Sequence, residues 1–437
     1  MMTENTRELA LDMLVSINEE GQYSHLLLRQ VLEKYQYLDK KERAFLTRLT
    51  EGTIERRITL DYVIDSFSRT KVNKMKPFIR NLLRLGVYQI MYMDSVPDSA
   101  ACNEAVKLAR KHGFSGLSGF VNGVLRSVAR GWKEVKYPDE RTASAKAWSV
   151  RYSVPEWMVT LWQTSYGMDK TKEILEGFQG EFPLCIRVNR NKTTPEDLKK
   201  RLEAAGITVE AAGGFSHAFF VRGVDYPAAL PGFAEGEFYV QDISSMRVAE
   251  LAGVRKGDYV IDVCAAPGGK SIYLAELLEG SGMVEARDLT EYKVGMLEEN
   301  IKRHGLTNCK AVLMDALADD ADSHDRADVL ICDLPCSGLG VMGKKTDIRY
   351  KMTMEKAKEL ASLQRQILSV VHKYVKPGGT LVYSTCTLHD EENEKNAEWF
   401  VKTFPEFTLV SQEQIFPRAG QGDGFFLGKF VRDGAGR

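Results

Sequence analysis

The sequence predicts a multidomain protein in which an all-α bundle is followed by a small α+β module and then by a parallel α/β sheet. Its 437 residues are enough for two or three domains with sizeable cores. Apolar residues recur at helical spacing up to about residue 130, whereas short apolar runs alternate with helical segments from about residue 236 onward. Alternation of this kind is typical of a parallel sheet.

The first 135 residues are expected to form the bundle. Leu9, Met13 and Ile17 repeat at helical spacing and predict a first amphipathic helix. Segments with the same spacing follow after short polar breaks, at residues 26–35, 41–58, 60–67, 77–91, 99–111 and 117–128. Because the breaks between them are short, neighbouring helices should pack into a compact bundle.

Residues 146–235 are expected to form the small α+β module, which a polar linker over residues 133–149 joins to the bundle. Apolar runs at residues 184–188 and 218–221 predict strands. Thr194 followed by Pro195 predicts the start of a helix, because threonine caps the first turn and proline fits the first helical position.

Residues 236–437 have the pattern of a Rossmann-like α/β domain. Strands are expected at residues 259–263, 283–286, 311–314, 329–332 and 380–384, and helices at residues 270–278, 291–304 and 354–374 separate most of them. The last two expected strands, residues 408–411 and 425–431, have no helix between them. They predict a hairpin at the edge of the sheet.

Charge is distributed unevenly along the chain, although the formal net charge is only −1. Residues 1–150 contain 24 basic and 18 acidic residues, and the remainder contains 35 and 42. Two stretches of the bundle have basic but no acidic residues, namely Arg69, Lys71, Lys74, Lys76, Arg80 and Arg84, and then Lys107, Arg110, Lys111, Arg126, Arg130 and Lys133. On one shared face they would suit a phosphate backbone, but an ordinary solvated face has the same composition.

Composition favours a cytoplasmic, monomeric protein that binds neither a membrane nor a metal. No apolar run is long enough to span a bilayer, and the N-terminus has no signal-peptide core. Seven cysteines, an odd number, favour reduced thiols. Cys332 and Cys336 are close, but no second pair follows them to complete a zinc site.

A small-residue loop after the first strand of the α/β part is a candidate cofactor site. It comprises Cys264, Ala265, Ala266, Pro267, Gly268, Gly269 and Lys270. Its glycines allow a ligand to approach the backbone, and the start of the following helix favours negative charge. Asp288 and Asp315 follow the next two strands, and together with Asp262 at the end of the first strand they indicate an adenosine-containing ligand. The loop matches neither GxGxxG nor the Walker pattern, which argues against a dinucleotide and ATP.

Two further segments each place a cysteine just after a strand. They are Asp333-Leu334-Pro335-Cys336-Ser337-Gly338 and Ser384-Thr385-Cys386-Thr387. A thiolate that adds to C6 of a pyrimidine makes C5 nucleophilic, so thiols beside a cofactor loop suit covalent catalysis. Cys102, Cys185, Cys309 and Cys332 are expected to be small core residues instead.

These motifs, in this order, resemble those of the RsmB family (also called Sun or Fmu), bacterial RNA cytosine-5 methyltransferases that modify small-subunit ribosomal RNA. The run from Tyr239 to Ser245 and the run from Gly422 to Phe426 also resemble family motifs. The N-terminal bundle is similar, more weakly, to RNA-binding domains of the NusB family. The resemblance covers nearly the whole chain.

The resemblance implies a class I methyltransferase fold, S-adenosyl-L-methionine as cofactor and 16S ribosomal RNA as partner, with cytosine 967 as the target. By position, Cys386 matches the nucleophile that bonds C6, and Cys336 matches the cysteine associated with release of the product. The loop Cys264–Lys270 with Asp288, Asp315 and Asp333 matches the cofactor contacts, and Asp333 also lies close to the target base. Leu334, where the family more often has alanine, and Arg287 depart from the pattern.

Two other interpretations are compatible with the sequence. A non-catalytic RNA-binding factor could be built on the bundle, but the presence of both thiols and every cofactor acid argues against it. The second alternative is a cytosine-5 methyltransferase that acts on transfer RNA or DNA. The well-known DNA enzymes carry a Pro-Cys nucleophile, so in an enzyme of that kind Cys336 would be the nucleophile.

Overall fold

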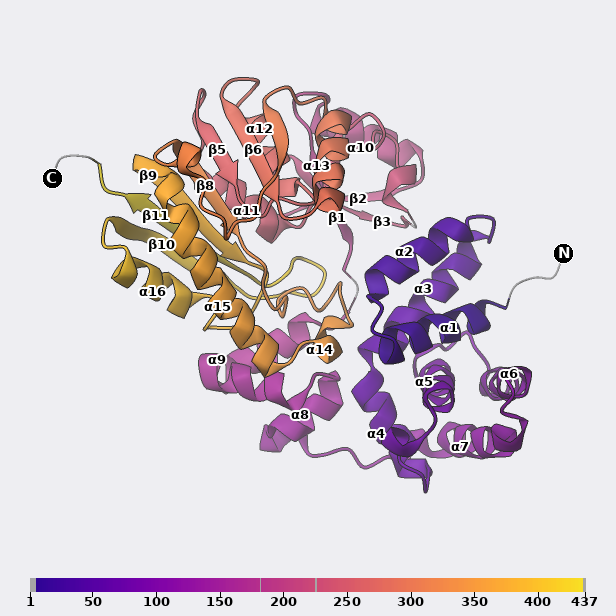
Figure 1. Ribbon diagram of the computed structural model, residues 1–437. Helices are drawn as coiled ribbons and strands as arrows, with labels where there is room; N and C mark the ends of the chain where they lie inside the picture. The colour runs from indigo at the N-terminus through magenta and orange to yellow at the C-terminus, as the bar shows by residue number, and fades with distance from the viewer. Residues whose placement is uncertain (1–4, 181, 225, 435–437) are drawn as a thin grey trace. The chain divides into compact units, whose positions relative to one another are not determined.

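The computed structural model describes residues 5–180, 182–224 and 226–434, and the chain divides into two compact units (Figure 1). The first unit comprises Met1–Leu175 and Lys344–Lys351, and the second comprises Glu176–Gly343 and Met352–Arg437. Among the described residues, none of the helices has the length and apolar character needed to cross a membrane.

The first unit is helical, as the sequence predicts. Its helices are α1 (Thr6–Glu19), α2 (Ser24–Lys34), α3 (Lys40–Glu55), α4 (Arg57–Phe67), α5 (Pro77–Tyr92), α6 (Asp98–Lys111), α7 (Ser118–Gly131), α8 (Ala145–Tyr152), most of α9 (Glu156–Gly177) and α14 (Ile348–Lys351). Leu14, Leu46, Leu83 and Leu125 are fully buried in its core. Helical periodicity therefore identifies the face of each helix that packs against the core.

The expected linker over residues 133–149 is wrong at its C-terminal end, because α8 begins there. Ser144 caps the helix by accepting a hydrogen bond from the backbone of Ala147 (3.2 Å). Trp148, Val150 and Tyr152 are buried, and their packing stabilises α8, although the sequence before them is polar.

The segment Lys344–Lys351 belongs to the first unit although it lies between the two cysteine motifs in the sequence. Arg349 is fully buried, and its guanidinium donates to the backbone carbonyls of Glu55 and Ser153, each at 3.2 Å. The ring of Tyr350 packs against the helical core. The chain that leaves the Cys336 motif therefore enters the helical unit before it returns to the sheet.

The small module forms a four-stranded antiparallel sheet in the order β2-β3-β1-β4. Its strands are β1 (Leu184–Val188), β2 (Thr208–Ala211), β3 (Ala218–Arg222) and β4 (Phe238–Val240), and α10 (Pro195–Ala204) accompanies them. Thr194 caps α10 as expected, accepting a hydrogen bond from the backbone of Asp197 at 3.2 Å. The sequence predicted β1 and β3 but missed β2 and β4.

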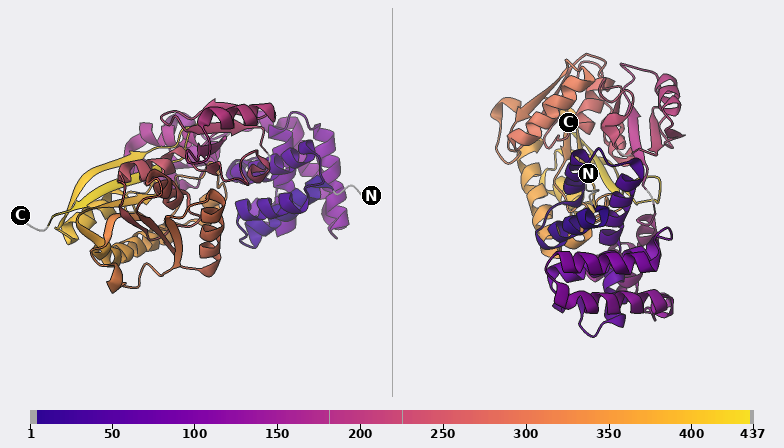
Figure 2. Two further views of the ribbon diagram at one scale, coloured as in Figure 1. Left: turned by 90° about the horizontal axis from the view of Figure 1, so that it is seen from above. Right: turned by 90° about the vertical axis from the view of Figure 1, so that its right-hand side faces the viewer.

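The large sheet has seven strands in the order β10-β11-β9-β8-β5-β6-β7, and Figures 1 and 2 show the final hairpin, coloured yellow, at one edge. The strands are β5 (Tyr259–Asp262), β6 (Met283–Asp288), β7 (Cys309–Leu313), β8 (Ala327–Asp333), β9 (Val375–Thr385), β10 (Phe407–Ile415) and β11 (Phe425–Arg432). Strands β5 to β9 pair in parallel, whereas β10 and β11 are antiparallel. Both the parallel sheet and the edge hairpin are confirmed.

Helices cover both faces of the large sheet. The helices α11 (Ile243–Ala252), α12 (Gly269–Leu277) and α13 (Glu291–His304) pack on one face, and α15 (Met354–Val371) and α16 (Glu394–Thr403) pack on the other. Val329 and Ile331 of β8 point to the first group, whereas Leu330 and Cys332 point to the second. A central strand buried on both faces explains the continuous apolar run in its sequence.

Candidate active site

The carboxyl ends of β5, β6, β8 and β9 lie at the same edge of the large sheet. β5 is the strand at which the order reverses, since β6 and β7 lie on one side of it and β8 and β9 on the other. In open α/β sheets a ligand binds at such a reversal, beyond the carboxyl ends of the strands. The candidate residues that follow these four strands are therefore brought to one edge.

The loop Cys264–Lys270 connects β5 to α12 and is fixed against the next strand. The backbone N–H of Ala265 donates to the carbonyl of Arg287 (2.8 Å), and that of Ala266 donates to the carboxylate of Asp288 (3.0 Å). These bonds tie the loop to the end of β6. The guanidinium of Arg287, unusual in this strand, is buried and paired with Glu285 on the same strand.

Two glycines at the start of α12 keep the backbone accessible. Gly268 has φ +110°, a conformation that other residues rarely adopt, and a Cβ on Gly269 would lie 3.1 Å from the ring of Tyr239. The hydroxyl of Tyr239 and the amide of Asn300 both donate to the carbonyl of Pro267, at 3.0 and 2.8 Å. The first N–H groups of α12 are thus held ready for an anionic group of a ligand.

Asp288 lies at the end of β6, beside the loop Cys264–Lys270. Its carboxylate accepts hydrogen bonds from the backbone of Ala266, the backbone of Leu289 (2.8 Å) and the ammonium of Lys293 (2.9 Å). A carboxylate has about four acceptor sites, so one remains for a ligand hydroxyl. Together with the N–H groups of α12, this donor and acceptor set fits an adenosine that carries an amino-acid tail, as in S-adenosylmethionine.

Asp315 lies farther out than the other candidate acids. It is exposed after β7, and its carboxylate accepts a hydrogen bond from the backbone of Leu317 at 2.9 Å. The residue before it, Met314, is linked to the site because its N–H donates to the carbonyl of Asp288 (3.0 Å). The structure thus places Asp315 next to the end of β6.

Lys270 and Asp333 form an ion pair at the centre of the site. The Nζ atom of Lys270 lies 2.6 Å from the carboxylate of Asp333, which also accepts a hydrogen bond from the hydroxyl of Ser384 (2.7 Å). Burial opposes the charge of Lys270, but the charge and hydrogen bond of Asp333, together with the charges of Asp262 and Cys386, outweigh this effect and raise the pKa of the lysine. Lys270 is therefore a permanent cation, and Asp333 is held as an oriented carboxylate.

The two thiols are adjacent. The Sγ atoms of Cys336 and Cys386 lie 3.2 Å apart, and both residues are partly exposed. The hydrogen bond between the thiols, together with burial, raises the pKa of Cys336 well above its ordinary value. Cys336 therefore keeps its proton and stays in hydrogen-bond contact with Cys386, and the cation of Lys270 also interacts with Cys386. This arrangement favours Cys386 as the thiolate of the pair.

A fully buried carboxylate, Glu392, lies behind the thiols and was not predicted from the sequence. It accepts hydrogen bonds from the backbone N–H of Ser337 (2.9 Å) and the amide of Gln364 (3.0 Å), and it also contacts a ring nitrogen of His389 (3.0 Å). The hydroxyl of Ser337 donates to it as well. A buried carboxylate is tolerated when several donors surround it, as here.

The network of Glu392 reaches the residue that follows each cysteine. The hydroxyl of Ser337 is 2.6 Å from the hydroxyl of Thr387, and these two residues directly follow Cys336 and Cys386. One carboxylate therefore fixes the spacing of both motifs. The sequence signal for it is the acidic run after Cys386, in which Glu392 is fully buried whereas Asp390 and Glu391 are partly exposed.

The remaining cysteines lie as expected. Cys102, Cys185, Cys309 and Cys332 are buried, and burial raises the pKa of Cys309 to about 12. Cys264 is partly exposed, and burial together with the neighbouring acids raises its pKa, so it stays a thiol. Within the part of the chain that the structure describes, no group of three or more His, Cys, Asp or Glu side chains is arranged to hold a metal ion.

Family models match three parts of the chain. Residues 250–431 match the 16S rRNA methyltransferase RsmB/F family, residues 4–130 match the NusB family, and residues 154–223 match the ferredoxin-like domain of RsmF/B-like methyltransferases. Among solved structures, PH0851 has a TM-score of 0.83 at 24% identity and covers 98% of this chain and 99% of its own, which shows the same fold. A methyltransferase homologue from Pyrococcus horikoshii is 26% identical over 66% of this chain and 99% of its own, with a TM-score of 0.57.

Curated relatives match over nearly the full length. A probable ribosomal RNA small subunit methyltransferase B of Bacillus subtilis (strain 168) is 36% identical, covering 99% of this chain and 95% of the relative. A ribosomal RNA small subunit methyltransferase B of Escherichia coli O1:K1 / APEC is 30% identical, covering 98% and 99%. Full-length similarity, the three family matches and the sheet-edge site agree: the chain belongs to the ribosomal RNA small subunit methyltransferase B family.

Proposed function

We propose that the protein transfers a methyl group from S-adenosyl-L-methionine to C5 of one cytosine in 16S ribosomal RNA, cytosine 967, through a covalent bond between Cys386 and C6. As a member of its family it is an S-adenosylmethionine-dependent RNA methyltransferase. The observation that supports the covalent route is the thiol pair, 3.2 Å apart, beside the ion pair of Lys270 and Asp333. Neutral cytosine is a poor carbon nucleophile, and a positioned thiolate overcomes this.

The proposed steps follow from the geometry. The thiolate of Cys386 bonds to C6, and the electrons of the C5–C6 double bond move toward C5 and the ring nitrogen N3. When bound, S-adenosylmethionine supplies the electrophilic methyl group, which C5 takes as the carbon–sulfur bond of the cofactor breaks. Water then takes the proton from C5, the electrons of the broken carbon–hydrogen bond restore the C5–C6 double bond, and the bond between C6 and Cys386 breaks so that Cys386 leaves as a thiolate. Cys336, in contact with Cys386, assists this release.

Asp333 and Lys270 are proposed to orient the reaction. Asp333 faces the site with one carboxylate oxygen held by Lys270 and the other by Ser384, so it presents a fixed acceptor to the target base. The target cytosine has to leave its stack to reach Cys386, as enzymes that modify bases require. The chain would use residues 1–135 and 146–235 to hold the RNA, and residues 236–437 for the chemistry.

The direct test is to map 5-methylcytosine in 16S ribosomal RNA from cells with and without the gene, and then after addition of the purified protein and S-adenosylmethionine. Loss of a single modified cytosine, restored by the protein, is expected. An unchanged 16S map together with a lost 5-methylcytosine in transfer RNA would assign the enzyme to a different substrate.

Removal of the proposed ribose acceptor is expected to weaken cofactor binding. Asp288→Ala should lower the affinity for S-adenosylmethionine by about 1.5–3 kcal/mol, the usual range for hydrogen bonds to a charged group. Isothermal titration calorimetry measures this directly. Asp322→Ala, a substitution on an exposed loop, serves as the control, and equal affinities for the two variants would reject the ribose role of Asp288.

Removal of the charge behind the thiols is expected to slow catalysis without changing cofactor affinity. Glu392→Gln replaces one acceptor of the buried network by a donor, so the spacing of Ser337 and Thr387 should relax. A loss in kcat of roughly 10–100-fold is expected, because misplacement of about 1 Å has such an effect. Glu391→Gln is the matched control, since Glu391 is partly exposed. A kcat for Glu392→Gln equal to that of the control would show that the network does not position the thiols.

The proposed basic surface of the bundle is smaller than the sequence suggested. Arg84 is buried and pairs with Asp61 (2.7 Å), so the expectation that it binds phosphate is wrong, and Arg80 is partly exposed and pairs with Glu19. Arg126 and Arg130 are exposed and contact only uncharged partners on their own helix in the bonds that the structure gives. These two remain candidates for phosphate contacts.

Neutralising Arg126 and Arg130 is therefore expected to reduce the salt dependence of RNA binding. Each lost phosphate contact should reduce the slope of log affinity against log salt by roughly 0.7–0.9. Filter binding of a 16S RNA fragment across a salt series measures the slope for Arg126→Gln and Arg130→Gln. Arg29→Gln, on an exposed helix of the same unit, is the control, and identical slopes would place the RNA elsewhere.

A further inference from the structure

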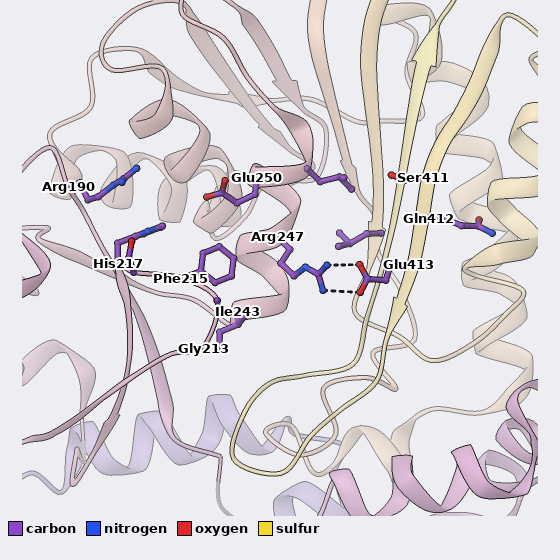
Figure 3. A pocket seen from close by; sticks show the side chains of 14 residues that line it. Arg190, Gly213, Phe215, His217, Ile243, Arg247, Glu250, Ser411, Gln412 and Glu413 are labelled. Atoms are coloured by element: carbon purple, nitrogen blue, oxygen red, sulfur yellow. Dashed lines mark hydrogen bonds and ion pairs between the residues drawn. The ribbon is translucent and has the colours of Figure 1, made fainter.

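A cavity of about 830 Å³ lies within the second unit, and neither the loop Cys264–Lys270 nor either thiol contributes to its lining (Figure 3). Three elements form its walls: the turn Gly213–His217 between β2 and β3, the helix α11, and the edge strand β10 with its neighbour β11. A cavity of this size accommodates a small ligand of several hundred Å³.

Most of the charges in the cavity are already paired. Arg247 and Glu413 form a two-point ion pair at 3.0 and 2.5 Å across it (Figure 3). Glu250 accepts a hydrogen bond from the hydroxyl of Tyr273, which also contacts a ring nitrogen of His217 at 2.8 Å. Burial and nearby arginines lower the pKa of His217 to about 4, so this histidine is neutral at neutral pH.

Arg190 is the exception. It is exposed at the cavity, and the structure records no ion pair for it with any of the described residues. Because Glu250 is bonded to the uncharged hydroxyl of Tyr273, Arg190 and Glu250 leave the lining without a net charge, and the guanidinium of Arg190 suits a single anionic group of a ligand rather than a polyanion.

An aromatic ring and a polar edge complete the lining. Phe215 is partly exposed and its ring faces the cavity, flanked by Gly213 and Gly214, around whose Cβ positions there is open space (Figure 3). Ser411 of β10 supplies a hydroxyl that can donate and accept a hydrogen bond, whereas the side chain of Gln412 points away from the cavity (Figure 3). A flat heteroaromatic ring with a hydrogen-bonding edge and one phosphate, that is, a nucleotide, matches these three features together.

The cavity is also connected to the strand that carries Cys386. Leu427, in its wall, pairs with Ser384 of β9, the residue whose hydroxyl donates to Asp333. A second connection runs through α11, since the hydroxyl of Ser244 donates to the carbonyl of Asp423 just before β11 (2.9 Å). An RNA chain whose cytosine occupies the site therefore has a nucleotide cavity next to the same strands.

We propose that this cavity binds one unpaired nucleotide of the RNA substrate, with its base stacked on Phe215 and its phosphate on Arg190. This inference rests on the proposed function, because it takes RNA as the substrate. The cavity would hold a nucleotide that flanks the target, and so contribute to the choice of the cytosine.

The test uses the full-length protein and a 16S RNA fragment that contains the target. Phe215→Ala should raise the dissociation constant about tenfold and leave the salt slope unchanged, because stacking involves no counterion. Phe215→Tyr should retain wild-type affinity. Arg190→Gln should weaken binding and reduce the salt slope by about 0.7. Arg222→Gln, another partly exposed arginine of the same module outside the cavity, should change nothing.

The outcomes separate the possible sources of the nucleotide. The cavity would be a site for free nucleotides if cytidine or adenosine monophosphate binds the wild type but not Phe215→Ala, while both proteins bind the RNA with equal affinity. That result would overturn the proposal. Wild-type affinity and slope for both Phe215→Ala and Arg190→Gln would also overturn it. If the wild type methylates the fragment and both variants keep its RNA affinity and salt slope, the cavity proposal alone fails. If the wild type neither binds nor methylates the fragment, the proposed function fails. Unchanged S-adenosylmethionine affinity in each variant verifies that it is folded.

Discussion

Replacing Cys386 by alanine is expected to abolish methyl transfer while the protein still folds and binds S-adenosylmethionine. Without the thiolate, C5 of cytosine has no source of nucleophilicity, and loss of a covalent nucleophile typically costs roughly 10⁴-fold or more in rate. The residue is partly exposed at the end of β9, so the smaller side chain leaves no cavity in the core. Transfer of a radiolabelled methyl group to 16S RNA measures the effect.

Two controls make this result specific. Cys102→Ala removes a buried thiol of the helical unit and should retain full activity per folded molecule. Calorimetry with S-adenosylmethionine should give the same affinity for Cys386→Ala as for the wild type. More than trace activity in Cys386→Ala would reject the assignment of the nucleophile.

Replacing Cys336 by alanine is expected to leave the enzyme attached to its RNA. The Cys336 thiol contacts Cys386 and keeps its proton, so it is placed to assist the departure of Cys386 and not to attack the base. Its loss should permit the first bond and block the last step. A denaturing gel of Cys336→Ala with RNA and S-adenosylmethionine should show a slowly migrating adduct.

The double variant decides which thiol forms the adduct. Cys336→Ala with Cys386→Ala should show no slow band. A band that persists without Cys386 would mean that another residue bonds the base. If instead Cys336→Ala is inactive without an adduct and Cys386→Ala remains active, the Pro335-Cys336 motif carries the nucleophile, as in DNA enzymes.

The fold was largely predictable because its elements are long and strongly patterned. β1 and α13 have the expected boundaries, and the strands of the parallel sheet differ from expectation mainly at their ends. β2 and β4 were missed because they have four and three residues, too short for periodicity to be evident. α16 was missed because it begins within an acidic run that resembles a loop, although Ala397 and Phe400 anchor it in the core.

The residues that directly follow strands were predictable parts of the site, whereas the contacts between residues far apart in the sequence were not. The two cysteine motifs follow β8 and β9, so their meeting at one edge follows from the parallel topology. The partners of Glu392 and Arg84 lie far away in sequence, 55 residues for Ser337 and 23 for Asp61. Counting charges along the chain cannot reveal such pairs, which explains both the missed carboxylate and the incorrect expectation for Arg84.

The most direct test of the central claim is mass spectrometry of the protein after reaction with S-adenosylmethionine and a 16S RNA fragment that carries 5-fluorocytosine at the target. Fluorine at C5 cannot leave as a proton does, so the covalent complex should accumulate. After digestion, the account predicts a single peptide that carries a methylated fluorocytidine on Cys386. A modified peptide that carries the nucleotide on Cys336, or no covalent complex while the same fragment with cytosine is methylated, would contradict it.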